Sequence, residues 1–240
     1  MVISLVGKAD DVAFYARLAA SSGDAALVLG CADGRIALEL CAQGQRVLGV
    51  DPSKSMIRSA EDRRSHEGVD PSRIRFVAAD VRSFRVDERF PLVLAPQNAL
   101  GLMGSLDELG MLLETVKRHL TDSGTFAFDV ATRVGSAAPA PREHSVEGQP
   151  PSIEPPRPPF VPHLRERRRR PDAEGAAIHR LRLSLFESDD LEQALASAGF
   201  GSRERFGGFD GRPFDGRAGT TVVVATSRPL PRSDTPAPGR

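Results

Sequence analysis

The sequence contains no tryptophan, one tyrosine and two cysteines among its 240 residues. Two cysteines cannot form the disulfide framework of a small secreted domain. We expect Cys31 and Cys41 to be buried free thiols, which suits a reducing cytosol. No apolar run approaches the roughly 20 residues that a membrane helix needs. The N-terminus also lacks the basic stretch, apolar core and cleavage site that follow one another in a secretory signal. We therefore expect a cytoplasmic protein without a membrane partner.

An excess of charge of one sign is also missing. The chain has 32 Lys and Arg residues against 32 Asp and Glu residues, so no overall field attracts nucleic acid or an anionic membrane. None of the five histidines has metal-ligand spacing with a cysteine or an acid pair, and we expect no metal site. Hydrophobic residues make up 40% of the chain, enough for the core of one α/β domain. We expect this domain to span residues 1–230, with a disordered tail over 231–240.

Seven apolar runs alternate with amphipathic helical patterns, which predicts a mostly parallel sheet that is covered on both faces. The predicted strands cover residues 25–29, 46–50, 74–79, 90–95, 124–130, 202–207 and 220–226. Regular structure is also expected at 178–186. Helix starts are expected at Asp10 or Asp11, at Ser53, at the capping box of Ser105 and Glu108, and at Ser188.

One segment has almost no apolar periodicity. Residues 135–175 contain ten of the 19 prolines and the arginine-rich run 165–170. A segment that cannot bury apolar area cannot offset the entropy lost on ordering, so we expect a disordered or loosely draped insert. The arginine run is a candidate patch for phosphate or nucleic acid. It has no interleaved aromatic residues, however, and a solvated loop is the better interpretation. The insert is also a candidate contact for a protein partner.

The most informative motif is a glycine turn followed by an acid. An apolar run over 26–29 enters the turn Gly30-Cys31-Ala32-Asp33-Gly34, and a second run over 47–50 ends at Asp51. This is the pattern of a βαβ unit in which backbone approaches a ligand closely and the acid accepts hydrogen bonds from a ribose. A dinucleotide-binding fingerprint would need a glycine where the chain has Arg35. The plain alternatives are a turn that only packs a strand against a helix and an acid that only caps a helix.

Two later segments complete the pattern, Phe76-Val77-Ala78-Ala79-Asp80 and Leu92-Val93-Leu94-Ala95-Pro96-Gln97-Asn98. In this order the motifs resemble those of class I S-adenosylmethionine (SAM)-dependent methyltransferases, over residues 10–130 and again over 178–227. The resemblance implies a three-layer Rossmann-like sandwich with a seven-stranded sheet and an antiparallel last strand. It also implies SAM as cofactor and S-adenosyl-L-homocysteine as product. This chain departs from the family pattern at Ala32, which replaces a glycine, and at Val28, which replaces an acid that helps hold the methionine amino group.

The resemblance also implies which residues bind the cofactor. The turn would be formed by Gly30, Ala32 and Gly34, and Asp51 would take both ribose hydroxyls. The wall beside the ribose and adenine would consist of Pro52, Ser53, Met56, Asp80 and Val81, with Asp80 accepting a hydrogen bond from the adenine amino group. Near the transferred methyl group would lie Pro96 and Asn98, with Tyr15 as a cover. Simpler roles stay open for three of them: Met56 and Tyr15 as core residues, and Asn98 as the cap of a turn.

The function that this resemblance implies is methyl transfer from SAM to a small-molecule acceptor by direct displacement. Such catalysis depends mainly on holding the methyl group in line with the acceptor, and the sequence identifies no general base. In the family the insert after the fifth strand often helps to build the acceptor pocket, so the acceptor stays open here. The alternative function is a methyltransferase-like binding or regulatory module without catalysis, which the departures at Val28 and Ala32 favour.

Overall fold

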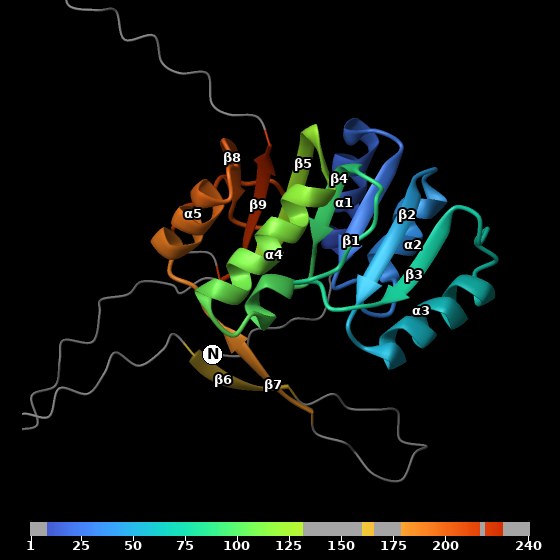
Figure 1. The fold of residues 1–240 in the computed structure, drawn as a ribbon, viewed down its shortest axis with the longest axis horizontal. Coiled ribbons are helices and arrows are strands. Elements are labelled where there is room, and N and C mark those ends of the chain that lie inside the picture. The colour runs from blue at the N-terminus through green and yellow to red at the C-terminus, as the bar shows by residue number, and fades with distance from the viewer. Residues whose placement is uncertain (1–8, 132–159, 166–178, 217–218, 228–240) are drawn as a thin grey trace, which may run out of the picture.

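A seven-stranded sheet in the order β3-β2-β1-β4-β5-β9-β8 forms the centre of the protein (Figure 1). The computed structural model describes residues 9–131, 160–165, 179–216 and 219–227. The strands of this sheet are β1 (Ala25–Leu29), β2 (Arg46–Asp51), β3 (Ile74–Ala78), β4 (Phe90–Ala95), β5 (Leu120–Val130), β8 (Ser202–Phe206) and β9 (Thr221–Thr226). The strands from β3 to β5 are parallel, whereas β9 is antiparallel to both of its neighbours. The predicted fold is therefore confirmed.

Helices cover both faces of the sheet and bury a separate core on each (Figure 1). One face packs against α1 (Ala9–Ser22), α2 (Arg35–Ala42) and α3 (Lys54–His66), and the other against the 3-10 helix η1 (Ala99–Leu102), α4 (Leu106–His119) and α5 (Ser188–Ser197). In β1 the side chains alternate between the two cores. Leu27 and Leu29 lie in the core beneath α4, and Ala26 and Val28 lie in the core beneath α1. Burial on both faces explains why this strand is a continuous apolar run.

The strand order reverses next to β1. The chain goes outward from β1 to β2 and β3, then crosses to β4 on the other side of β1. In an open parallel sheet, ligands bind outside the carboxyl ends of the strands at such a reversal. The topology therefore places the candidate site at the carboxyl ends of β1 and β4.

Two helix starts are confirmed. The Met56 N–H donates to Ser53 Oγ at 3.3 Å at the start of α3, and the Glu108 N–H donates to Ser105 Oγ at 3.2 Å at the start of α4. The Glu108 carboxylate accepts the N–H of Gly104 rather than that of Ser105. In the capping box of α4, the hydrogen bond to the Glu108 carboxylate thus comes from the residue before the capping residue Ser105.

Two other predicted helix starts are wrong. Asp10 and Asp11 lie in the first turn of α1 rather than before it, and Ser188 is the first helical residue of α5, with Glu187 in the capping position. In both cases another side chain takes the capping group. Arg35 binds the Asp11 carboxylate, and Arg205 donates to Ser188 Oγ at 2.5 Å.

A second, two-stranded sheet lies beside the main one (Figure 1). It pairs β6 (Phe160–Arg165) with β7 (His179–Ser184) in antiparallel register. The sequence predicted regular structure at 178–186, but it did not predict a strand at 160–165, inside the expected insert. The backbone of β6 pairs with that of β7, and backbone pairing leaves little trace in the apolar periodicity of a sequence. The rest of the expected insert lies outside the described residues, and its disorder stays a prediction.

Gly49, in the middle of β2, marks a close contact within the core. A Cβ atom at this position would lie 2.6 Å from Phe76 Cδ1 and 3.0 Å from Cys31 Sγ. We expect Gly49→Ala to lower the free energy of unfolding by about 1–3 kcal/mol, because the ring and the thiol must move in a packed interior. Urea unfolding measures the change.

The matched control is Gly110→Ala. A Cβ at Gly110 meets nothing within 4 Å, and the residue lies inside α4, where alanine is more favourable than glycine by about 0.5–1 kcal/mol. The two substitutions should therefore change stability in opposite directions. Equal stability of the Gly49→Ala and wild-type proteins would contradict the packing described.

Candidate functional site

The turn between β1 and α2 is held against the end of β2. The N–H groups of Gly30 and Cys31 both donate to the Val50 carbonyl oxygen, at 2.7 and 3.0 Å. Gly30 and Gly34 have φ angles of 71° and 77°, in the left-handed region that favours glycine. A Cβ atom at Gly30 would lie 3.1 Å from Ala99 Cβ, so the turn lies directly against the loop that follows β4.

Asp51 ends β2 and ties the glycine turn to the start of α3. Its Oδ2 accepts the N–H of Ala32 at 3.0 Å, and its Oδ1 accepts the N–H of Ser53 at 2.8 Å. Ala32 itself has a φ of 50°, a strained conformation of the kind that concentrates at functional sites. Asp51 is buried, and each of its oxygens keeps one acceptor position beyond these two hydrogen bonds. Two acceptor positions on one carboxylate match the two hydroxyls of a ribose.

The first turn of α3 continues the wall beyond Asp51. Pro52 is exposed, and Ser53 and Met56 are half-buried. Met56 belongs to neither of the two buried cores, so its side chain is available to a ligand. That Met56 packs on an adenine stays a prediction.

Asp80 follows β3, and Arg82 occupies its carboxylate. The Arg82 guanidinium donates to both oxygens, at 2.6 Å for the shortest contact, and the Arg82 N–H donates to Oδ1 at 2.9 Å. These hydrogen bonds hold the pKa of Asp80 below its usual value. Arg82 also pairs with Glu108 on α4. An adenine amino group would have to compete with Arg82 for this carboxylate, whereas the buried Val81 has only its backbone to offer.

Asp129, which the sequence analysis missed, is a buried carboxylate near the end of β5. Its Oδ1 accepts the Tyr15 hydroxyl at 2.8 Å and the Gln97 N–H at 2.7 Å, and its Oδ2 accepts the Asn98 N–H at 2.9 Å. Burial raises the pKa of Asp129 to about 6, although the three hydrogen bonds act in the opposite direction. An acid within the otherwise apolar end of a predicted strand, next to Val130, was the signal that could have identified it.

Tyr15 donates its hydroxyl to this carboxylate, and whether it covers a bound cofactor stays a prediction. Its ring is fully buried in the α1 core and contacts Phe14 and Phe209 edge to face. Burial and the neighbouring Asp129 raise the pKa of the Tyr15 hydroxyl, which keeps it a hydrogen-bond donor. This placement fits the core alternative, with the added task of holding Asp129.

The loop after β4 is strained and carries an unused hydrogen-bond donor. Gln97 and Asn98 have φ angles of 58° and 57°, left-handed at two successive residues that are not glycine. The buried Asn98 amide accepts the Ala131 N–H through Oδ1 at 3.0 Å, and its Nδ2 has no hydrogen-bond partner among the described residues. Pro96 is buried at the end of the same strand. The asparagine therefore fastens the loop and leaves an amide N–H₂ group without a partner, as a ligand contact would require.

A buried ion pair supports the turn from behind. Arg35, the first residue of α2, donates to both oxygens of Asp11 on α1, at 2.8 and 2.6 Å. Asp11 is 3% exposed, so this bidentate pair is largely withdrawn from solvent. It fixes the start of α2 relative to α1, which carries Tyr15. The role of Asp11 was missed in the sequence, because pairing between two helices leaves no local pattern.

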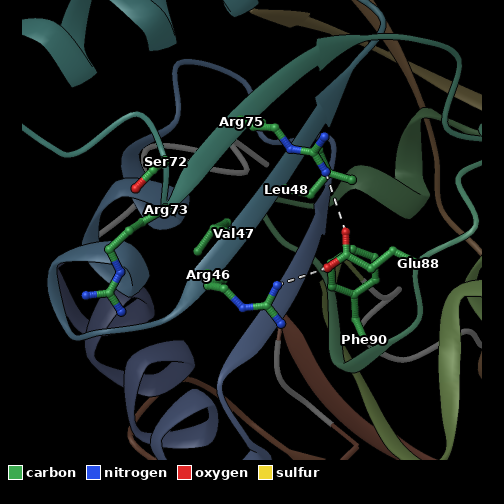
Figure 2. Close-up of a pocket in the computed structure, with 8 residues that line it drawn as sticks. All are labelled: Arg46, Val47, Leu48, Ser72, Arg73, Arg75, Glu88 and Phe90. Carbon is green, nitrogen blue, oxygen red and sulfur yellow. Dashed lines mark hydrogen bonds and ion pairs between the residues drawn. The ribbon is translucent and has the colours of Figure 1, made fainter.

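The hollow in Figure 2 lies at the opposite edge of the sheet. It measures about 230 Å³ and is lined by Arg46, Val47, Leu48, Ser72, Arg73, Arg75, Glu88 and Phe90, at the amino ends of β2, β3 and β4. Glu88 pairs with both Arg46 and Arg75, as the dashed lines in Figure 2 show. This hollow is separate from the carboxyl edge and shares no residue with the predicted site.

Within the described ranges, no three His, Cys, Asp or Glu side chains are grouped as a metal ion would require. No helix in the same ranges combines the length and the apolar character that crossing a bilayer demands.

The raised pKa of Asp129 predicts a specific dependence of stability on pH. The pKa of the Asp129 carboxyl rises from 3.8 to about 6 on folding. The protonated carboxyl therefore stabilises the folded state at low pH. This contribution disappears as the pH rises through the two values, and ionisation costs about 3 kcal/mol at pH 7. Between pH 3.5 and pH 7, wild-type stability should fall relative to that of Asp129→Asn by about this amount.

Denaturant unfolding of both proteins across this range measures the difference. Asp122→Asn is the control, since the Asp122 side chain is fully exposed and should leave the pH dependence unchanged. Parallel curves for wild type and Asp129→Asn would show that the Asp129 pKa is not raised.

Known proteins share both the sequence and the fold of this chain. A family model described as a methyltransferase domain matches residues 26–124. An uncharacterized methyltransferase of Schizosaccharomyces pombe is 31% identical over 126 residues, covering 50% of this chain and 47% of that protein. Cypemycin N-terminal methyltransferase from a Streptomyces species is 30% identical over 107 residues, covering 45% of this chain and 42% of that protein. The chain thus matches less than half the length of each relative.

The fold extends the similarity beyond the matched residues. The crystal structure of an S-adenosylmethionine-dependent methyltransferase from Clostridium acetobutylicum superposes with a TM-score of 0.71, at 15% identity, over 92% of each chain. The resemblance read from the motifs is therefore confirmed. A methyltransferase-domain family model thus matches residues 26–124, and the chain shares its fold with a SAM-dependent methyltransferase of known structure.

Proposed function

We propose that the chain binds SAM at the carboxyl ends of β1, β2 and β4 and transfers its methyl group to a small-molecule acceptor. The observation that carries the proposal is the Asp51 carboxylate. It is buried beside a left-handed glycine turn, and each oxygen has one acceptor position left. This geometry fits a ribose, and the turn has little room for a side chain at Gly30, where a Cβ would lie 3.1 Å from Ala99 Cβ.

The remaining predicted residues fit the same ligand to different degrees. Ser53 and Met56 extend the wall from Asp51, and the Ala79 N–H donates to the Asp51 carbonyl oxygen at 3.1 Å, which brings the end of β3 to the same wall. Asp80 would share its carboxylate between Arg82 and the adenine. Asn98 offers an amide N–H₂ at the loop after β4. When bound, the cofactor supplies an electrophilic methyl group on a sulfonium.

The residues of this chain would act by positioning. Asp51 and the glycine turn hold one end of the cofactor, and the loop of Pro96, Gln97 and Asn98 forms the neighbouring wall where β4 ends. Because the loop is fixed by Asp129 and Ala131, it is preorganised rather than ordered on binding. The name of the cypemycin relative states methylation at an N-terminus, which supports an amine among the acceptors to be tested first. The buried thiols of Cys31 and Cys41 support a reducing, cytoplasmic setting.

A second candidate function is a binding module without catalysis. Two observations favour it: Val28 is fully buried and uncharged, and Arg82 occupies the Asp80 carboxylate. Failure of the purified protein to bind S-adenosyl-L-homocysteine would favour a module that has lost the cofactor site. If the protein binds it, transfer of a methyl group from SAM to an amine acceptor is the measurement that separates the two candidates.

Removal of the Asp51 carboxylate should weaken this binding. We expect Asp51→Ala to raise the dissociation constant of S-adenosyl-L-homocysteine by at least about tenfold, since charge-assisted hydrogen bonds to two hydroxyls are lost. Isothermal titration calorimetry measures the constant. Asp51→Asn keeps the volume and one acceptor oxygen, and should lie between wild type and Asp51→Ala.

Asp122→Ala, on the surface, is the control and should bind as wild type does. An unchanged dissociation constant in Asp51→Ala would remove the ribose assignment.

Position 28 provides a separate test of how the site holds charge. Val28 is fully buried in the core beneath α1, so a carboxylate there would lose its hydration without gaining a partner. We expect Val28→Glu to lower the melting temperature and to leave the affinity for S-adenosyl-L-homocysteine no tighter. Val28→Leu, which keeps the apolar character, controls for volume. Tighter binding at an unchanged melting temperature would instead place position 28 in the cofactor pocket.

A further inference from the structure

Asp129 is a buried carboxylate that has no cationic partner among the side chains that the structure describes. Residues 10–131, 183–201, 203–216 and 219–227 provide no ion-pair partner for it, although it is only 6% exposed. The charged groups that face it are Asp11 on α1 and Arg35 on α2, and these two are joined to each other in a bidentate pair. Its other neighbours, Tyr15 and the backbone of the β4 loop, are neutral donors. A buried carboxylate in such surroundings gains free energy from a positively charged partner.

Asp129 lies near the carboxyl edge of the sheet, where the candidate crevice is. Val28 on β1, Leu94 on β4 and Ala127 on β5 lie side by side in one row across the sheet. Asp129 lies two residues beyond Ala127 on the same face, one step closer to the carboxyl edge. Its carboxylate reaches sideways over the end of β4, where it accepts the N–H of Gln97.

The loop that Asp129 holds is the one that touches the glycine turn. Ala99, which follows Asn98, is the neighbour that a Cβ on Gly30 would meet at 3.1 Å. Only β4 therefore lies between the strand of Asp129 and β1, whose following turn is where the cofactor is proposed to bind.

The hydrogen-bonding capacity of Asp129 is not exhausted. Oδ1 accepts two hydrogen bonds, from Tyr15 and Gln97, whereas Oδ2 accepts one, from Asn98. One acceptor position on Oδ2 remains. Within the cofactor that the proposed function requires, the amino group of the methionine moiety is protonated and positively charged at pH 6 to 7, and it is a hydrogen-bond donor.

We propose that Asp129 receives the positively charged amino group of the bound cofactor and is a binding residue of the site, in addition to holding the β4 loop. The inference rests on the proposed function, since it concerns the same crevice. In this proposal the negative charge that binds the amino group comes from β5. The β1 side chain in the same row is Val28, which is apolar. Tyr15 then acts as a positioning residue, which fixes Oδ1 and leaves Oδ2 for the ligand.

Proton release on binding tests this role without a turnover assay. Because the pKa of Asp129 is about 6, roughly half of the free protein carries a proton on this carboxyl at pH 6. A bound ammonium group requires the ionised form, so binding should expel up to about half a proton per site. Calorimetry of S-adenosyl-L-homocysteine at pH 6, in two buffers of different ionisation enthalpy, measures the number released. At pH 8 the release should vanish.

The ligand control is the analogue of S-adenosyl-L-homocysteine that lacks the amino group. Wild type should bind it about 10- to 100-fold more weakly and release no proton, since the charge-assisted contact is absent. In Asp129→Asn the two ligands should bind with similar affinity. Asp51→Asn should weaken both ligands by the same factor, because Asp51 is assigned to the ribose.

The outcomes separate the two proposals. If wild type binds neither ligand, the proposed function fails and the inference fails with it. If wild type binds both ligands equally well, or releases no proton at pH 6, only the inference is overturned. Where Asp129→Asn does not fold, the wild-type comparison of the two ligands and of the two pH values decides alone.

Discussion

Two carboxylates on flanking strands hold the loops of the two central strands, and the candidate site depends on this arrangement. Asp51 at the end of β2 fixes the turn that follows β1, through the N–H of Ala32. Asp129 near the end of β5 fixes the loop that follows β4, through the N–H groups of Gln97 and Asn98. Because β1 and β4 are neighbours at the reversal of strand order, both loops line one crevice. Rigid strands thus supply the acceptors, and the loops supply the shape.

The same two contacts explain where the backbone is strained. Ala32, Gln97 and Asn98 are the residues other than glycine with positive φ in the described part of the chain, and each donates its N–H to one of the two carboxylates. A left-handed conformation at a residue with a side chain costs about 1–2 kcal/mol. A charge-assisted hydrogen bond in a buried setting offsets a cost of this size. The strain is therefore coupled to the acids, and it persists because they are present.

Much of this architecture could be predicted from the sequence, and the limits have physical causes. Asp51 was identified because a strand end and a glycine turn at fixed spacing leave a local signature. Asp129 was not, because its partners Tyr15, Gln97 and Asn98 lie more than 30 residues away along the chain and meet it only through the sheet. The pairing of Asp80 with Arg82 was equally hidden, although the two are close in sequence, since many acids near arginines remain unpaired. The strand β6 was missed because backbone pairing with β7 needs no apolar pattern.

Charge neutralisation distinguishes the residues that hold the fold from those that face a ligand. Asp11 is paired with Arg35, and Asp80 and Glu108 are both paired with Arg82, so each of these acids has a cationic partner within the described structure. Asp51 and Asp129 are buried at the carboxyl edge, and neither forms an ion pair with any described residue. Both keep acceptor capacity after satisfying the backbone around them. A ligand complementary to this edge must therefore bring hydroxyl donors to one end and a positive charge to the other, and the distance between the two carboxylates is set by the sheet itself rather than by a mobile loop.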